Sequence, residues 1–304
     1  MAGASAILLL VACAPPALDG LPPSPGKSTI VQYGAASARP DTPIIIPLSP
    51  YAGRLVTVRA VAGSDTLRML FDTGAGLTLV MPGVARRLGC TPSGRIVGHR
   101  MTGDRVEFTR CAGATLALEG LVVRHEPIGV FDLMALLPPE LPRLDGVLSL
   151  ATFAGQTLTL NLRCRLLLVE SPASARTRTR GMHPLAARIA TGASGGGLTV
   201  FVRAGTGPTP IWLELDSGNL DHVLLSPHAA VALGLDTVVM GDSAIVAPIP
   251  VTGLDATPMR TALRALIHDG ALNETWMAQG ELTFDLASGL VWSDLSARAT
   301  SCSL

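Results

Sequence analysis

The chain has 304 residues, too many for one compact hydrophobic core and suited to two units of about 120 to 150 residues each. Hydrophobic residues make up 48% and charged residues only 15%, with 32 glycines and 23 prolines, which excludes a disordered polar chain and a charged coiled coil and favours a turn-rich, all-β protein. The charges of the 23 basic and 23 acidic residues cancel, so the formal net charge is zero. No net charge is therefore available to attract nucleic acid or an anionic membrane, and we expect neither partner.

The N-terminus carries a short apolar stretch, residues 6–12, that runs directly into Cys13. It is too short to span a bilayer, so we interpret residues 1–12 as a signal peptide. Leu10-Val11-Ala12-Cys13 resembles a bacterial lipobox, in which the cysteine is acylated and becomes the mature N-terminus. An ordinary signal peptide with an incidental cysteine is the alternative. We expect an exported, periplasmic or cell-envelope lipoprotein that meets the membrane only through this lipid, with residues 13–41 as a Pro-rich tether.

Four cysteines remain if Cys13 is acylated, namely Cys90, Cys111, Cys164 and Cys302. In an oxidising compartment they allow three disulfide pairings, and Cys90 with Cys111 closes the shortest loop, so we expect that pair first. Neither the cysteines nor the six histidines have the spacing typical of metal ligands. We therefore expect no metal and no organic cofactor.

The sequence contains an internal repeat. Asp145-Gly146-Val147-Leu148 returns as Asp269-Gly270-Ala271-Leu272, and the β-hairpin pattern at 158–168 returns at 282–292 with the same offset of 124. A second match relates 67–89 to 210–234, and each copy predicts a strand, an Asp-[Thr/Ser]-Gly turn, another strand and a short helix. These matches place the first repeat at 42–169, a polar linker at 170–180, the second repeat at 181–296 and a tail at 297–304.

Each repeat has one Asp-[Thr/Ser]-Gly turn, Asp72-Thr73-Gly74 in the first and Asp216-Ser217-Gly218 in the second. One such tripeptide is weak evidence, but two in register within a duplicated unit are much stronger. With Ala75 after the first glycine and the segment LDGVLSL at 144–150, the chain resembles the aspartic proteases of the pepsin and retropepsin type. The resemblance implies an all-β, bilobal pepsin-like acid-protease fold made of two related retropepsin-like β-barrel lobes.

The resemblance also implies an aspartic endopeptidase, with Asp72 and Asp216 as its catalytic residues. Hydrolysis of a peptide bond by water needs a base for the water proton and an acid for the carbonyl oxygen. Two carboxyl groups about 3 Å apart cannot both ionise easily, so they share one proton and supply both roles. By the same resemblance Thr73, Gly74, Ser217 and Gly218 support the pair, the glycines through a sharp turn and the hydroxyls through bonds across the junction. The expected partner is a peptide or protein substrate, and we expect a monomer.

Enzymes of this type cover the substrate with a flap, and the first repeat is long enough to contain one. Asp72 and Asp145 are 73 residues apart, whereas Asp216 and Asp269 are 53 apart, so the first repeat holds 20 more. Residues 96–108 predict a β-hairpin, and we assign its tip, Met101, Thr102, Gly103 and Asp104, to the flap. A plain surface hairpin is the alternative.

Three residues depart from the family pattern. Asn219 follows the second glycine, where the family usually has Ser, Thr or Ala, and Ser149 and Asn273 occupy positions where glycine is usual. Given these departures, the alternative function is a catalytically degenerate aspartic-protease-like lipoprotein that binds peptides or acts as a scaffold.

Overall fold

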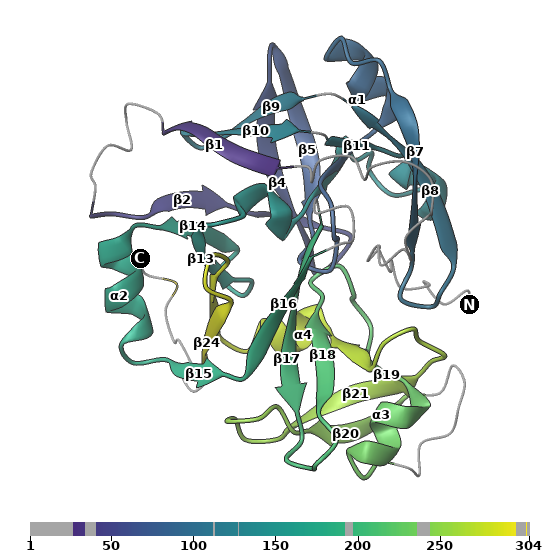
Figure 1. Ribbon diagram of the computed structural model, residues 1–304, viewed down its shortest axis with the longest axis vertical. Helices are drawn as coiled ribbons and strands as arrows, with labels where there is room; N and C mark the ends of the chain where they lie inside the picture. Colours follow the sequence, from purple (N-terminus) through teal and green to yellow (C-terminus); the bar gives the residue numbers. More distant parts are fainter. Residues whose placement is uncertain are drawn as a thin grey trace, which may run out of the picture.

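The computed structural model describes residues 27–33, 41–111, 113–126, 128–191, 197–235, 244–295 and residue 302. In them the chain forms two β-rich lobes joined by a shared sheet, which confirms the predicted all-β, bilobal architecture (Figure 1). Among these residues no helix has both the length and the apolar character needed to span a membrane. The predicted signal peptide, Cys13 and most of the tail lie outside the described residues.

Lobe one is built on an eleven-stranded sheet in the order β1-β10-β9-β4-β5-β12-β6-β11-β8-β7, with β3 paired to β4. Its strands are β1 (Lys27–Tyr33), β3 (Ser49–Tyr51), β4 (Leu55–Ala62), β5 (Asp65–Phe71), β6 (Leu79–Val80), β7 (Ser93–His99), β8 (Arg105–Cys111), β9 (Ala114–Leu118), β10 (Leu121–Glu126), β11 (Ile128–Val130) and β12 (Gly146–Leu148). The short helix α1 (Pro82–Arg87) follows β6, as the sequence predicted, and 3-10 turns occupy Leu133–Leu136 and Leu150–Phe153.

Lobe two repeats this plan with fewer strands, in the order β16-β17-β18-β22-β19-β21-β20. They are β16 (Ala187–Thr191), β17 (Leu198–Ala204), β18 (Ile211–Leu215), β19 (Val223–Leu225), β20 (Ile245–Ile249), β21 (Thr257–Leu263) and β22 (Gly270–Leu272), with helices α3 (Pro227–Ala232) and α4 (Glu274–Met277). The side chain of Ser226 caps α3 by accepting a hydrogen bond from the Ala229 N–H.

A six-stranded sheet joins the lobes in the order β15-β24-β23-β13-β14-β2. It consists of β2 (Ile44–Pro47), β13 (Thr157–Asn161), β14 (Leu166–Glu170), β15 (His183–Leu185), β23 (Glu281–Asp285) and β24 (Leu290–Asp294). At its centre β13 pairs antiparallel with β23, so that Thr159 lies opposite Thr283, its own copy 124 residues later. Their buried hydroxyls are 2.9 Å apart. The two sequence repeats are therefore related in space by pseudo-two-fold symmetry, and the symmetry axis passes between these two threonines.

The recurring Asp-Gly pair is explained by a crowded strand crossing in each lobe. A Cβ atom at Gly146 would lie 2.1 Å from the carbonyl oxygen of Leu79, and one at Gly270 would lie 2.2 Å from that of Leu224. Only glycine fits where two backbones approach so closely. The preceding aspartate is equally fixed, because Asp145 Oδ2 accepts a hydrogen bond from the backbone N–H of Arg68 at 2.9 Å.

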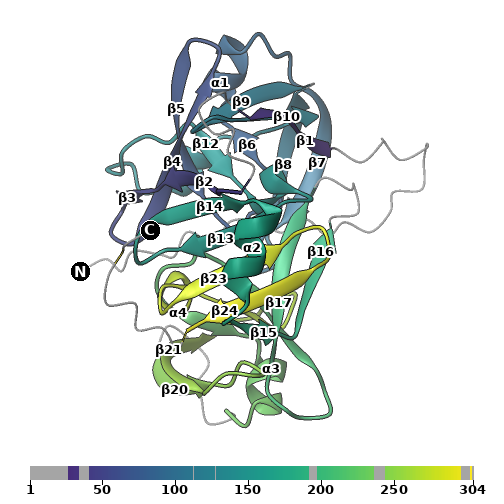
Figure 2. The ribbon, with the colours of Figure 1, turned by 90° about the vertical axis from the view of Figure 1, so that its left-hand side faces the viewer.

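The predicted linker and the predicted tether both contain regular secondary structure. The predicted linker is largely the helix α2 (Pro172–Thr179), which lies over the shared sheet (Figure 2). A capping box between Ser171 and Ser174 starts this helix. Residues 27–33 of the predicted tether form β1, which pairs antiparallel with β10. The segment KSTIVQY contains the β-branched residues that strands favour.

Two disulfides connect the remaining cysteines. Cys90 is bonded to Cys111, which confirms the expected pair, and Cys164 is bonded to Cys302. The second bond ties the turn between β13 and β14 to the C-terminal tail.

Candidate active site

Asp72 and Asp216 occupy equivalent positions at the ends of two buried strands. Asp72 follows β5 and donates its backbone N–H to the carbonyl of Leu148, at 3.1 Å. Asp216 follows β18 and donates to the carbonyl of Leu272, at 3.0 Å. Both acceptors end the strand that lies parallel to the aspartate's own, β12 and β22. The two lobes thus hold their aspartates by the same construction.

The two carboxyl groups meet at the junction of the lobes. Each accepts a hydrogen bond from the glycine of its own turn, Gly74 N–H to Asp72 Oδ1 and Gly218 N–H to Asp216 Oδ1, both at 2.9 Å. Each glycine also lies against the other lobe's carboxyl group, because a Cβ at Gly74 would be 2.5 Å from Asp216 Oδ1. At Gly218 it would be 2.5 Å from Asp72 Oδ2. The absence of side chains at both positions lets the aspartates face each other.

The neighbouring hydroxyl residues cross-link the two turns. The Thr73 backbone N–H donates to Ser217 Oγ, and the Ser217 backbone N–H donates to Thr73 Oγ1, both at 3.0 Å. Each hydroxyl then donates to the strand that leads into the opposite aspartate, Thr73 Oγ1 to Leu215 O at 2.6 Å and Ser217 Oγ to Phe71 O at 3.4 Å. This reciprocal network fixes the separation of the carboxyl groups.

Burial controls how the pair holds protons. Asp72 and Asp216 are 0% and 1% exposed. Burial raises the pKa of Asp72 to about 6, opposed by hydrogen bonds from Gly74 and neighbouring groups. Burial, the Asp72 charge and the Glu214 charge together raise the pKa of Asp216 well above its usual range. Asp72 Oδ2 has no hydrogen-bond donor among the described residues, and a proton on Asp216 supplies one. The two carboxyl groups therefore titrate as one pair, and between its two ionisations the pair holds one proton and one negative charge.

The predicted flap residues lie on a hairpin that reaches from lobe one to lobe two. Strands β7 and β8 pair antiparallel and extend toward lobe two (Figure 1). At their turn Met101 is buried against Leu224, Ala262 and Ala271 of lobe two. The carbonyl of Met101 accepts a hydrogen bond from the backbone N–H of Ile267 at 2.9 Å. Thr102 and Asp104 bond to each other on the exposed side of the turn, and Gly103 has a positive φ of 88°.

The three departures from the family pattern make local hydrogen bonds. Asn219 donates its side-chain amide to the carbonyl of His222 at 2.9 Å, and Asn273 caps α4 by accepting from the Trp276 N–H at 3.1 Å. Ser149 donates its backbone N–H to Thr78 Oγ1 at 3.1 Å. None of these contacts displaces the loop that carries Asp216, whose hydrogen bonds match those of the Asp72 loop.

Sequence reasoning missed two interactions at the lobe junction. Arg54 of lobe one donates to Thr275 Oγ1 at 2.7 Å and to the carbonyl of Leu220 at 2.9 Å, both in lobe two. Glu214 and His268 form a buried pair beside Asp216. The sequence did contain one signal for Glu214, because an acidic residue two positions before Asp216 interrupts an apolar strand.

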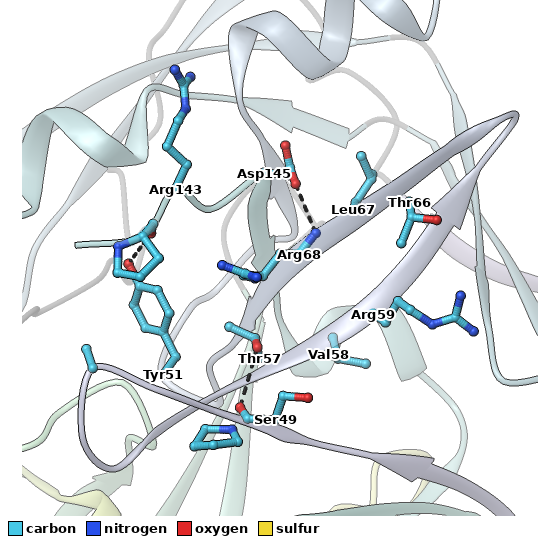
Figure 3. A pocket seen from close by; sticks show the side chains of 13 residues that line it. Ser49, Tyr51, Thr57, Val58, Arg59, Thr66, Leu67, Arg68, Arg143 and Asp145 are labelled. Atoms are coloured by element: carbon cyan, nitrogen blue, oxygen red, sulfur yellow. Dashed lines mark hydrogen bonds between the residues drawn. The ribbon is translucent and has the colours of Figure 1, made fainter. Parts of the chain in front are cut away.

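A separate pocket of about 570 Å³ lies on lobe one around β3, β4 and β5 (Figure 3). Several of its polar groups already have partners, since Tyr51 donates its hydroxyl to the carbonyl of Pro142 and Asp145 accepts from the Arg68 N–H. Arg59 and Arg143 point away from its centre (Figure 3). Neither Asp72 nor Asp216 lines this pocket. In the described part of the chain, no group of three or more His, Cys, Asp or Glu residues is placed to hold a metal ion.

Comparison with known proteins identifies the architecture. No protein-family model and no curated protein sequence matches the chain. Among solved structures, it is similar to basic 7S globulin from soybean, with a TM-score of 0.54 and 10% sequence identity over 86% of this chain and 98% of the globulin. At that identity the likeness concerns the fold alone. The chain has a bilobal, all-β, pepsin-like fold.

Proposed function

We propose that the protein is an aspartic endopeptidase that hydrolyses peptide bonds with a water molecule activated between Asp72 and Asp216. The observation that carries this proposal is the meeting of the two buried carboxyl groups, each backed by the other lobe's glycine and fixed by the reciprocal hydroxyl bonds. A pair of carboxyl groups that shares one proton is suited to general acid–base chemistry on a peptide bond. The substrate is an extended peptide or protein segment.

The singly protonated pair supplies both roles. The charged carboxylate acts as the base and takes a proton from water as the water oxygen attacks the carbonyl carbon. The protonated carboxyl group gives its proton to the carbonyl oxygen, which yields a neutral tetrahedral diol. When the carbon–nitrogen bond breaks, the carboxyl group that took the water proton gives it to the leaving nitrogen, and a diol hydroxyl returns a proton to the other carboxylate. No covalent intermediate with the protein forms, and the pair ends as it began.

Substitution of either aspartate tests the proposal directly. We expect Asp72→Asn and Asp216→Asn each to lower kcat on an unstructured protein substrate by about three orders of magnitude or more, with the double variant little worse, because the two residues act as one unit. Asp255→Asn, which removes an exposed carboxylate of lobe two, is the matched control and should retain full activity. A statine-type inhibitor, whose hydroxyl replaces the water, should bind wild type and lose affinity in both aspartate variants.

Two results would contradict the proposal. Near wild-type activity of purified Asp216→Asn would rule out a mechanism that uses both lobes. Absence of hydrolysis by the wild type under all conditions would favour the alternative, a degenerate aspartic-protease-like protein that binds peptides or acts as a scaffold.

We further propose that Cys13 is the acylated N-terminus of an exported lipoprotein, an inference from the sequence alone. Membrane fractionation of wild type and Cys13→Ala tests it. Wild type should be found with the membrane and the variant should be released. Equal behaviour of the two proteins would exclude a lipid at Cys13.

A further inference from the structure

Lobe two contains a buried acid–imidazole pair where lobe one has two leucines. Glu214 corresponds to Leu70, with the same offset of 144 that relates Asp216 to Asp72, and His268 corresponds to Leu144 with the offset of 124. Both leucines are fully buried core residues. The duplicated fold is therefore stable with an apolar pair at these positions, and the polar pair is a specific feature of lobe two.

The pair is isolated from other polar groups. His268 Nε2 lies 3.3 Å from Glu214 Oε2, and the side chains are 17% and 0% exposed. None of their side-chain nitrogen and oxygen atoms has a regular hydrogen-bond partner among the described residues. The ring of Phe201 meets the imidazole edge-on, with centroids 5.8 Å apart. Replacing both members of a buried polar pair by apolar residues of similar shape is often neutral or stabilising, so stability alone does not explain why Glu214 and His268 are present.

Glu214 lies next to the proposed catalytic pair. Alternate residues of a strand share one face, so Glu214 and Asp216 lie on the same side of β18 and its continuation, about 7 Å apart. Directly across the sheet from Glu214 is Ala271, which the tip of the hairpin covers through Met101. Glu214 thus lies on the sheet face that the hairpin closes.

The charges around the pair are mostly negative. Burial and the Asp72 charge raise the pKa of Glu214 well above its usual range, and burial lowers the pKa of His268 to about 4 despite the charge of Asp269. Glu214 in turn raises the pKa of Asp216. The guanidinium of Arg188, in the same lobe, lies over the rings of Phe201 and Trp212.

We propose that Glu214, which lies beside His268, is a positioning residue that keeps the shared proton on Asp72 and Asp216 at higher pH and so extends hydrolysis toward neutral pH. The inference rests on the proposed function. Once Glu214 and one aspartate of the pair are charged, loss of the last proton from the pair would place a third negative charge in one buried cluster. At an effective dielectric constant near 20, charges about 7 Å apart shift each other's pKa by about one to two units.

The pH dependence of kcat/KM tests this role. In wild type it should rise as the aspartate pair loses its first proton and fall as the pair loses its second. Glu214→Gln keeps the shape of the side chain and removes its charge, so the falling limb should move down by about one to two pH units while the rising limb stays in place. Because the glutamine could destabilise the fold, the double variant Glu214→Leu/His268→Leu, which copies lobe one, provides a second measurement with the same expected shift. Asp255→Asn should leave both limbs unchanged.

If the falling limb of the kcat/KM profile stays in place in both folded variants, the inference is overturned. Glu214 and His268 would then have a purely structural role. A second readout separates this failure from failure of the proposed function. Carbon-13 NMR of labelled aspartate carboxyl groups follows the ionisation of the pair even in a protein without peptidase activity. The uppermost aspartate titration should move to lower pH in both Glu214 variants, and an unchanged titration would also overturn the inference.

Discussion

Thr73→Val should destabilise the protein strongly although the two side chains have nearly the same shape. The lost hydroxyl accepts from the Ser217 N–H at 3.0 Å and donates to the Leu215 carbonyl at 2.6 Å, and both partners are buried backbone groups at the lobe junction. A buried polar group left without a partner costs about 1–3 kcal/mol, so the two together predict a loss of about 2–6 kcal/mol. That is a large part of the 5–15 kcal/mol typical of folded domains.

Urea unfolding of the intact chain, followed by both circular dichroism and tryptophan fluorescence, measures this loss. Trp276 adjoins Met277, whose sulfur lies 3.9 Å from the Thr73 hydroxyl, so the fluorescence reports on the junction itself. Thr73→Ser is the matched control, because it keeps the hydroxyl and removes only a methyl group. If Thr73→Val unfolds within about 0.5 kcal/mol of wild type, the hydroxyl network does not hold the lobes together and the reasoning is refuted.

Three further changes probe the framework around the site. Gly146→Ala places a Cβ 2.1 Å from a strand carbonyl and should lower stability by about 3 kcal/mol or more, measured by thermal unfolding. Asn273→Ala removes the cap of α4 and should cost about 1 kcal/mol in the same assay. Arg178→Met leaves the buried Glu170 without its ion-pair partner and should cost about 3–5 kcal/mol in urea unfolding.

Each of these changes has a matched comparison. Gly181→Ala adds a Cβ in open space and should be neutral, so equal effects at Gly146 and Gly181 would show that the strand crossing is not crowded. Asn273→Asp keeps a capping oxygen, and a loss equal to that of the alanine variant would contradict the cap. Arg178→Lys keeps a positive charge, and it should retain part of the stability lost in Arg178→Met.

The internal repeat made much of the fold predictable from the sequence. Alignment of the two copies of a duplicated segment shows which positions are equivalent. This alignment located the strand–turn–strand units around Asp72 and Asp216 and the hairpins at 158–168 and 282–292. Local signals were also sufficient for α1 and α3, whose first residues are Pro82 and Pro227. These features depend on residues that are close together in the chain.

Features that depend on distant residues could not be predicted in this way. The strand at 27–33 is recognisable only through β10, almost 90 residues further along, and on its own it looked like part of a tether. Glu214 and His268 are 54 positions apart, and nothing in the sequence brings them together before the sheet of lobe two is assembled. The helix α2 was within reach of local reasoning, because its capping signal was present but was outweighed by the polar composition.

The shared sheet has a consequence for the lobes as separate chains. Half of its strands come from each lobe, and the seam between β13 and β23 runs through the middle. A lobe expressed alone would therefore expose a row of unpaired backbone amides and carbonyls at this seam. Such an exposed edge promotes edge-to-edge association between molecules. Because β23 is the sequence copy of β13, a second molecule of lobe one could fill the vacant place with its own β13. In the fused chain, β23 is always present beside β13 at a one-to-one ratio, so a second copy of lobe one has no vacant edge to occupy.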